Sequence, residues 1–244
     1  MEEIISVKQL SKSYGRLNAV QGLDLSVTQG SVFGLLGANG AGKSTTIECM
    51  LGTRKPDAGT VSILGMTPLL QRKQLFENVG VQFQEANYQD KVTVSELCEV
   101  TQSLYKNAAD YGVLLKQFGI FDKAKSMVKD LSGGQRQKLF IVLALIPQPK
   151  VVFLDELTTG LDAKARREVW KILSDLKEKG LTIFLTSHFM DEVEALCDTI
   201  CILKKGKAVF YGKVEEAIAG SPYDKFEDAY LWYSDEGVSE NENI

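Results

Sequence analysis

The segment VFGLLGANGAGKST, residues 32–45, is the most informative part of the sequence about the fold. Its first part, residues 32–36, is a short apolar run followed by glycine, which is typical of a buried strand of a parallel sheet. Residues 43–51 have a helical pattern, so a helix is expected there. Between the two, Gly37, Gly42, Lys43 and Ser44 have the spacing of a phosphate-binding loop. A glycine-rich turn can match this spacing by chance, but the flanking strand and helix favour an α/β protein that binds a nucleotide.

The residue types in this loop suit the binding of phosphates. Glycines allow consecutive backbone N–H groups to turn inward, and the following helix presents its positive N-terminus. Lys43 would reach the β- and γ-phosphates, and the Ser44 hydroxyl would ligate Mg²⁺. The candidate nucleotide-binding residues are Gly37, Ala38, Asn39, Gly40, Ala41, Gly42, Lys43, Ser44 and Thr45.

A second apolar run, residues 151–154, ends in two acidic residues, Asp155 and Glu156. The carboxyl end of a parallel strand faces the ligand side of an open α/β sheet. Asp155 is suited to hold Mg²⁺, directly or through water, and Glu156 to position and polarise an attacking water. The alternative is an ordinary strand followed by a solvated acidic turn, but the phosphate loop in the same chain favours the catalytic interpretation.

Strand and helix patterns alternate along the rest of the chain, which predicts a mainly parallel sheet covered by helices. Expected strands include IISVK, AVQGLDLSV, residues 59–65 and LTIFLTS, with a hairpin around Lys205 and Gly206. Expected helices cover residues 110–118, 134–146, 163–179 and 189–196, and Thr93 and Glu96 have capping-box spacing. The predicted fold is a P-loop NTPase core with an N-terminal antiparallel β subdomain and an inserted helical subdomain.

The domain limits follow from the same patterns. We expect a nucleotide-binding domain over residues 1–220, with the helical subdomain at about 92–146. Residues 221–244 are expected to form a C-terminal packing segment and an acidic tail whose last ten residues are disordered.

Composition limits the classes of partner. The 244 residues include 28 basic and 32 acidic side chains, a formal net charge of −4, which argues against a nucleic-acid partner. The longest apolar run, residues 139–146, is much shorter than the roughly 20 residues of a membrane helix. Any membrane role is therefore expected to depend on a partner.

The segment LSGGQ lies between the phosphate loop and the acidic strand end. Its serine and glycines predict a helix start with available N–H groups, which would form a second anion site. The segment resembles the signature of ABC ATPases, and kinases, GTPases and helicases have no such segment. The resemblance follows the family's motif order from about residue 4 to residue 211. It implies ATP as the nucleotide and a site for the partner chain's ATP at Leu131, Ser132, Gly133, Gly134 and Gln135.

The resemblance also assigns roles before and between these motifs. Tyr14 resembles the aromatic residue that stacks on adenine; the alternative is a surface tyrosine in the turn SKSYG. Gln84 resembles the glutamine that touches Mg²⁺ and the lytic water, with a polar residue at a strand end as the alternative. Gln82 is two residues away, but the family register favours Gln84. The implied metal ligands are Ser44, Gln84 and Asp155.

Further roles follow the acidic strand end. Gly160, Leu161 and Asp162 resemble the loop that crosses to the partner subunit. His188 follows the strand LTIFLTS and resembles the histidine that contacts the γ-phosphate; the alternative is a core or surface histidine. The implied catalytic residues are Lys43, Gln84, Glu156 and His188.

The chain departs from the family pattern at one position. Leu157 stands where the family usually has proline after the acidic pair, so the loop loses a fixed φ and the turnover rate is in question. All the catalytic groups are nevertheless present, which predicts an active ATPase.

The resemblance implies an ATP-binding and ATP-hydrolysing subunit of an ABC transporter. It would form a homodimer or heterodimer around two ATP molecules at the cytoplasmic face of a membrane, docked on membrane-spanning permease subunits. The tail FEDAYL, residues 226–231, resembles that of type-2 and drug-resistance exporters, which favours export. The alternative function is that of a soluble, non-transport ABC ATPase acting on a protein or nucleic-acid partner.

Overall fold

A computed structural model describes residues 2–82, 91–156, 158 and 160–234. The chain divides into two compact units, one formed by Met1–Arg72 with Thr186–Ile244 and the other by Lys73–Leu185. The two units are described separately below. Among the described residues, no helix has the length and apolar character needed to cross a bilayer.

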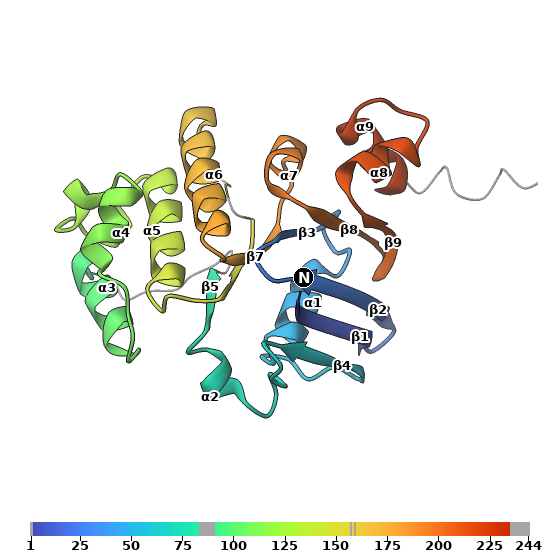
Figure 1. Cartoon of the computed structure of the whole chain (residues 1–244), viewed down its shortest axis with the longest axis horizontal. Helices are drawn as coiled ribbons and strands as arrows, with labels where there is room; N and C mark the ends of the chain where they lie inside the picture. Colours follow the sequence, from blue (N-terminus) through green and yellow to red (C-terminus); the bar gives the residue numbers. More distant parts are fainter. Residues whose placement is uncertain (1, 83–90, 157, 159, 235–244) are drawn as a thin grey trace, which may run out of the picture. The chain divides into compact units, whose positions relative to one another are not determined.

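The first unit contains the predicted antiparallel β subdomain. Strand β1 (Glu3–Tyr14) pairs with β2 (Leu17–Thr28) on one side and with β4 (Ala58–Ile63) on the other, as Figure 1 shows in blue and teal. Strand β1 extends well beyond the predicted segment IISVK, whereas β2 exceeds the predicted AVQGLDLSV by only two residues at its start and one at its end. A bulge interrupts β1 at Gln9, whose φ is 51°. Asp24 accepts hydrogen bonds from both the backbone and the side-chain amide of Gln9, so the bulge is fixed.

The same unit holds the strand that leads into the phosphate loop. Strand β3 (Val32–Gly37) is buried throughout and pairs in parallel with β8 (Thr199–Lys204), which pairs antiparallel with β9 (Lys207–Gly212). Helix α1 (Lys43–Met50) follows β3, and the hairpin predicted around Lys205 and Gly206 is confirmed.

Helices α7 (Met190–Leu196), α8 (Val214–Ala219) and α9 (Phe226–Ser234) complete this unit. Helix α7 begins one residue later than predicted because Phe189 is extended and forms its N-cap. Phe226 of α9 is buried in a core cluster that also includes Leu36, Val193 and Ile202, so the C-terminal segment packs on this unit. Figure 1 shows α8 and α9 close together beside β9.

The second unit is a three-stranded parallel sheet with helices. Its strands are β5 (Val79–Gln82), β6 (Val151–Leu154) and β7 (Thr182–Thr186), in the order β5-β6-β7. The short helix α2 (Arg72–Leu75) precedes β5. Apolar runs of four or five residues suffice for these strands because they are buried on both faces.

Helices α3 (Val94–Ser103), α4 (Tyr111–Gln117) and α5 (Gly133–Leu145), with two 3₁₀ turns at Phe121–Lys123 and Val128–Asp130, form the inserted helical region. The predicted capping box of α3 is confirmed, because Thr93 and Glu96 each bond the other's backbone N–H. Asp110 caps α4, which shortens the predicted helix by one residue at each end. Helix α5 begins and ends one residue earlier than predicted.

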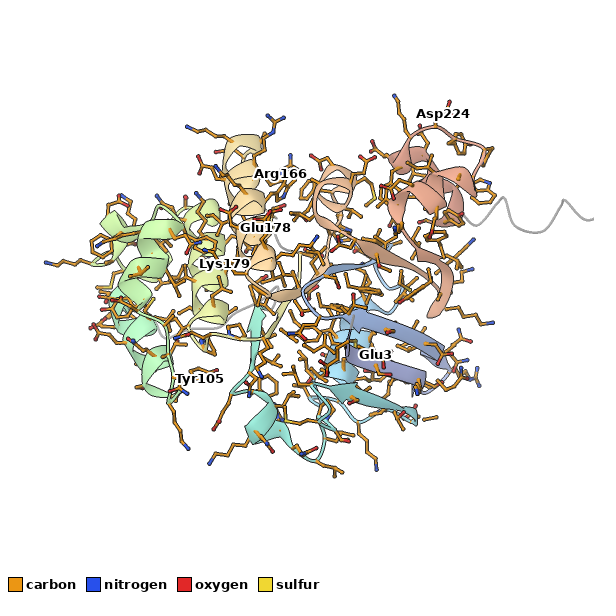
Figure 2. The ribbon with its side chains drawn as sticks, viewed as in Figure 1. Glu3, Tyr105, Arg166, Glu178, Lys179 and Asp224 are labelled. Carbon is orange, nitrogen blue, oxygen red and sulfur yellow. The ribbon has the colours of Figure 1, made fainter. Side chains whose placement is uncertain are left out.

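Helix α6 (Ala163–Glu178) is amphipathic, as its sequence predicts. Val169 and Leu173 are fully buried, whereas the polar side chains of the opposite face are exposed. Figure 2 labels Arg166 near its start and Glu178 at its end. The Arg166 guanidinium carbon lies 5.8 Å from the centre of the Trp170 ring, one turn further along the helix.

Candidate nucleotide site

The phosphate loop joins β3 to α1 through a backbone that only glycine adopts readily. Gly37, Gly40 and Gly42 have φ values of 148°, 80° and 108°. A side chain on Gly42 would overlap the carbonyl oxygen of Ala19, so this position excludes larger residues on steric grounds as well. The glycine spacing read from the sequence is therefore required by the local conformation.

Lys43 lies folded over this loop. Its side chain is buried, and Nζ donates to the carbonyl oxygens of Gly37 at 2.7 Å and Ala38 at 3.2 Å. The ammonium therefore sits where the loop would hold an anion, next to the N-terminus of α1. This geometry fits a polyphosphate, which would supply oxygen acceptors for the same donors.

The acidic strand end is fixed by its neighbour β5. The Asp155 N–H donates to the Gln82 carbonyl at 3.0 Å, and the Gln82 side-chain amide donates to the Asp155 carbonyl at 3.2 Å. These bonds continue the β5–β6 ladder beyond Leu154. Asp155 is buried, and its carboxylate is an oxygen ligand of the kind that Mg²⁺ prefers.

Glu156 follows on a backbone with φ of 52°, a conformation that residues with side chains rarely adopt. The Gln137 side-chain amide donates to the Glu156 carbonyl oxygen at 3.4 Å. Sequence reasoning did not identify Gln137. It lies two residues after the LSGGQ segment, and only the approach of α5 to this turn gives it a role.

The LSGGQ segment opens α5, as predicted. Ser132 is the N-cap: its hydroxyl accepts from the Gln135 N–H, and the Gln135 side chain accepts from the Ser132 N–H. This capping box fixes the first helical turn, which contains the two glycines. The helix start predicted at this segment is therefore confirmed, and the anion site stays a prediction.

The predicted dimer loop lies beside this helix start. A Cβ on Gly134 would lie 3.1 Å from the Leu161 side chain and 3.6 Å from the Gly160 carbonyl oxygen. Asp162 caps α6, accepting from the Ala165 N–H at 2.8 Å. The LSGGQ segment and the 160–162 loop thus form one local structure, in which glycine permits the close approach.

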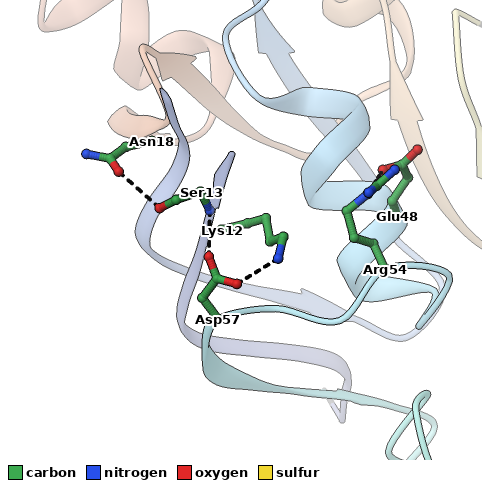
Figure 3. A network of polar contacts seen from close by, with 6 residues as sticks. All are labelled: Lys12, Ser13, Asn18, Glu48, Arg54 and Asp57. Carbon is green, nitrogen blue, oxygen red and sulfur yellow. Dashed lines mark hydrogen bonds and ion pairs between the residues drawn. The ribbon is translucent and has the colours of Figure 1, made fainter. Parts of the chain in front are cut away.

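Tyr14 ends β1 and is 39% exposed. The Lys12 ammonium and the Arg54 guanidinium carbon lie 5.7 Å and 5.2 Å from the ring centre. Asp57 binds Lys12 at 2.6 Å, and Glu48 binds Arg54 at 2.5 Å (Figure 3). The hydrogen bond from Lys12 holds the pKa of the Asp57 carboxyl below its usual range. Two anchored cations, which the sequence did not predict, therefore lie near the Tyr14 ring.

The remaining candidate residues are His188, Gln84 and Leu157. His188 is exposed, two residues after the end of β7. Gln84 and Leu157 lie outside the described residues. Tyr14, Lys43 and His188 belong to the first unit, and Asp155, Glu156 and the LSGGQ segment belong to the second.

Comparisons with known proteins agree with this set of motifs. Residues 20–159 match the family model described as ABC transporter. The chain is 41% identical over 220 residues to the Nod factor export ATP-binding protein I of Ralstonia nicotianae, covering 88% of this chain and 68% of the relative. The protein of the same name from Rhizobium etli is 38% identical, with 88% and 69% coverage.

Solved structures show the same fold. An ATP-binding subunit of an ABC transporter matches with a TM-score of 0.86 and 26% identity, covering 94% of this chain and 99% of that chain. A dimeric ATP-binding cassette in a post-hydrolysis state with ADP and Pi matches with a TM-score of 0.78 and 25% identity, covering 86% and 98%. The predicted fold class is thus confirmed. The chain belongs to the ABC transporter family, and its motifs are those of the family's ATP-binding subunits.

Proposed function

We propose that this chain binds ATP with Mg²⁺, hydrolyses it, and thereby powers export through separate membrane-spanning subunits. The observation that carries the proposal is the phosphate loop, in which a glycine backbone and the Lys43 ammonium are arranged to receive phosphates between β3 and α1. The curated relatives named as export ATP-binding proteins support the direction of transport.

ATP would be held by residues of the first unit. The Tyr14 ring would stack on adenine, and Lys43 would exchange its bonds to the loop carbonyls for bonds to the β- and γ-phosphates. Backbone N–H groups of residues 37–45 would surround the phosphates. Ser44, Asp155 and Gln84 would hold Mg²⁺, which neutralises charge on the phosphates and leaving group when bound.

Hydrolysis would depend on Glu156 and His188. The Glu156 carboxylate would orient a water molecule toward the γ-phosphate and accept its proton, while His188 would contact the γ-phosphate. Gln84 would touch the same water. The strained Glu156 backbone fits a residue that must be held in one direction, because such conformations persist where the surroundings fix them.

Two chains would be needed for each complete site. The sequence has one phosphate loop and one LSGGQ segment. Leu131, Ser132, Gly133, Gly134 and Gln135 of one chain would bind the ATP held by the other, with Gly160, Leu161 and Asp162 crossing between them. The partner would be a second copy or a related ATPase. Dimeric cassettes among the similar solved structures support this arrangement.

The proposed place of work is the cytoplasmic face of a membrane, reached through permease subunits. The net charge of −4 favours such protein partners over nucleic acid. Residues 1–220 would form the ATPase domain, with 92–146 as its helical subdomain and 221–244 as a C-terminal extension. Closure of the dimer with ATP and its reopening after hydrolysis would bias the permease between two states.

The test is the Glu156→Gln variant, which keeps the shape of the side chain and removes its basicity. We expect ATP binding to persist, turnover to fall by about 100-fold or more, and an ATP-dependent dimer to accumulate. Turnover is measured by phosphate release, and the dimer by size-exclusion chromatography with light scattering.

Glu178→Gln is the matched control, because the same chemical change is made at the end of α6. It should leave turnover and association at wild-type values. A Glu156→Gln protein that hydrolyses ATP normally and stays monomeric would show that Glu156 is not the general base.

A further inference from the structure

The turn between β8 and β9 contacts the phosphate loop from a distant part of the sequence. The Gly206 N–H donates to the Ala41 carbonyl oxygen at 2.9 Å. The Gly206 carbonyl accepts from the Gln21 N–H at 2.8 Å, and the Gln21 side-chain amide donates to the Lys205 carbonyl at 2.7 Å. The turn is therefore joined to the loop on one side and to β2 on the other.

Around Gly206 and the loop glycines, neighbouring backbone atoms leave no space for a side chain. A Cβ on Gly206 would lie 2.7 Å from the Ala19 carbonyl oxygen, and one on Gly42 would overlap that same oxygen. At the other end of the loop, a Cβ on Gly37 would lie 2.5 Å from the Leu203 carbonyl oxygen. Both ends of the phosphate loop thus pack against the β8–β9 hairpin or its direct neighbour in β2.

The bond from Gly206 also sets the direction of a loop peptide. The C=O and N–H groups of one trans peptide point in opposite directions. Because the Ala41 carbonyl points to Gly206, the N–H of Gly42 in the same peptide is turned away from the hairpin. A phosphate-binding loop depends on the direction of such N–H groups.

From this geometry we infer that the Lys205–Gly206 turn is a positioning element of the ATP site. It holds the Ala41–Gly42 peptide in the orientation that receives the nucleotide's phosphates. Gly206 is buried, whereas Lys205 and Lys207 on either side are exposed, so the turn presents backbone to the loop and side chains to solvent. The inference rests on the proposed function of the phosphate loop.

The main variant is Gly206→Ala, compared with Gly65→Ala. The two glycines have φ of 79° and 72°, so alanine meets similar backbone strain at both. No atom would lie within 4 Å of a Cβ on Gly65, whereas one on Gly206 would press on Ala19. Any difference between the two variants therefore reports displacement of the Lys205–Gly206 turn from β2, and with it from Ala41 of the phosphate loop.

We expect Gly206→Ala to weaken ATP binding by about tenfold or more, since small misplacements of a site cost large factors. The measurement is isothermal titration of each folded variant with Mg-ATP, together with steady-state turnover. KM for ATP should rise more than kcat falls, and Gly65→Ala should bind like the wild type.

A second variant, which removes one hydrogen bond without a backbone clash, keeps the test valid if Gly206→Ala does not fold. Gln21→Met keeps the length of the side chain but removes the amide that holds the Lys205 carbonyl. We expect KM for ATP to rise by about threefold, close to the effect of one neutral hydrogen bond. Gln29→Met, on an exposed residue just after β2, is its control.

Equal ATP affinity in Gly206→Ala and Gly65→Ala, or unchanged KM in Gln21→Met, would overturn the inference while leaving ATP binding by the chain intact. Failure of the wild type to bind ATP would instead contradict the proposed function, and this inference with it.

Discussion

Glu156 carries its carboxylate on a backbone with φ of 52°, and its carbonyl oxygen accepts from the Gln137 side chain at 3.4 Å. A residue in this conformation costs of order 1 kcal/mol or more, so the surroundings must fix it. Gln137 belongs to α5, whose first turn contains the LSGGQ glycines. The proposed general base and the segment proposed to bind the partner's ATP are therefore joined within one chain.

Replacing Gln137 tests that link. Gln137→Met should lower kcat by about threefold, the scale of one hydrogen bond, with KM for ATP unchanged, because only the direction of Glu156 is altered. Lys138→Met is the control, since Lys138 bonds Glu168 instead. The measurement is steady-state phosphate release; a rise in KM with unchanged kcat would assign Gln137 to binding.

The cysteines give a prediction based on pKa. Burial raises the pKa of the Cys98 and Cys201 thiols to about 12, and burial also raises that of Cys49. These thiols stay protonated near pH 8 in the folded state, and only the thiolate reacts. A disulfide reagent should therefore label half-buried Cys197 first. Cys197→Ser should remove the fast phase.

The same shifts predict how stability depends on pH. A raised folded-state pKa means that the unfolded chain releases its thiol protons first, from its ordinary value of about 8.5. The contribution of these buried, protonated thiols to the free energy of unfolding is fully present below about pH 8.5 and is lost as the pH rises toward 12. The measurement is the urea midpoint as a function of pH, and a midpoint that stayed unchanged over this range would contradict the assigned burial.

Helix α5 approaches β5 so closely that a Cβ on Gly80 would overlap the Ala144 carbonyl oxygen. Gly80→Ala should therefore cost about 3 kcal/mol of unfolding free energy, because backbone must move. Gly180→Ala is the control, with positive φ and no atom within 4 Å of its Cβ. It should cost about 1 kcal/mol in urea denaturation. Equal losses of unfolding free energy in the two variants would show that α5 can shift away from β5 at little cost.

Much of the element pattern was predictable because its causes are local. The phosphate loop, the capping box of α3, the helix start at the LSGGQ segment and the β8–β9 hairpin each depend on residues a few positions apart. The length of β1 could not be predicted from its apolar segment, because polar residues extend this strand through pairing with β2 and β4 and through a bulge at Gln9. Gly206 was predicted only as a turn residue. Its contact with Ala41 joins segments far apart in sequence, for which no local pattern exists.

Each of the two units holds part of the motif set, and the sequence has one copy of each motif. The family membership follows from the comparisons, whereas the partners do not. The export proposal therefore depends on what the chain assembles with. A subunit that powers transport must bind a multi-span protein in stoichiometric amount, and ATP should stabilise that complex when hydrolysis is blocked.

The decisive measurement is a pull-down of tagged Glu156→Gln chain from detergent-solubilised native membranes with ATP and Mg²⁺, read by quantitative mass spectrometry. We predict stoichiometric recovery of a multi-span membrane protein. Lys43→Ala, which should not hold ATP, is the control for dependence on nucleotide. Recovery of soluble partners alone, with no membrane protein in stoichiometric amount, would contradict the transport function.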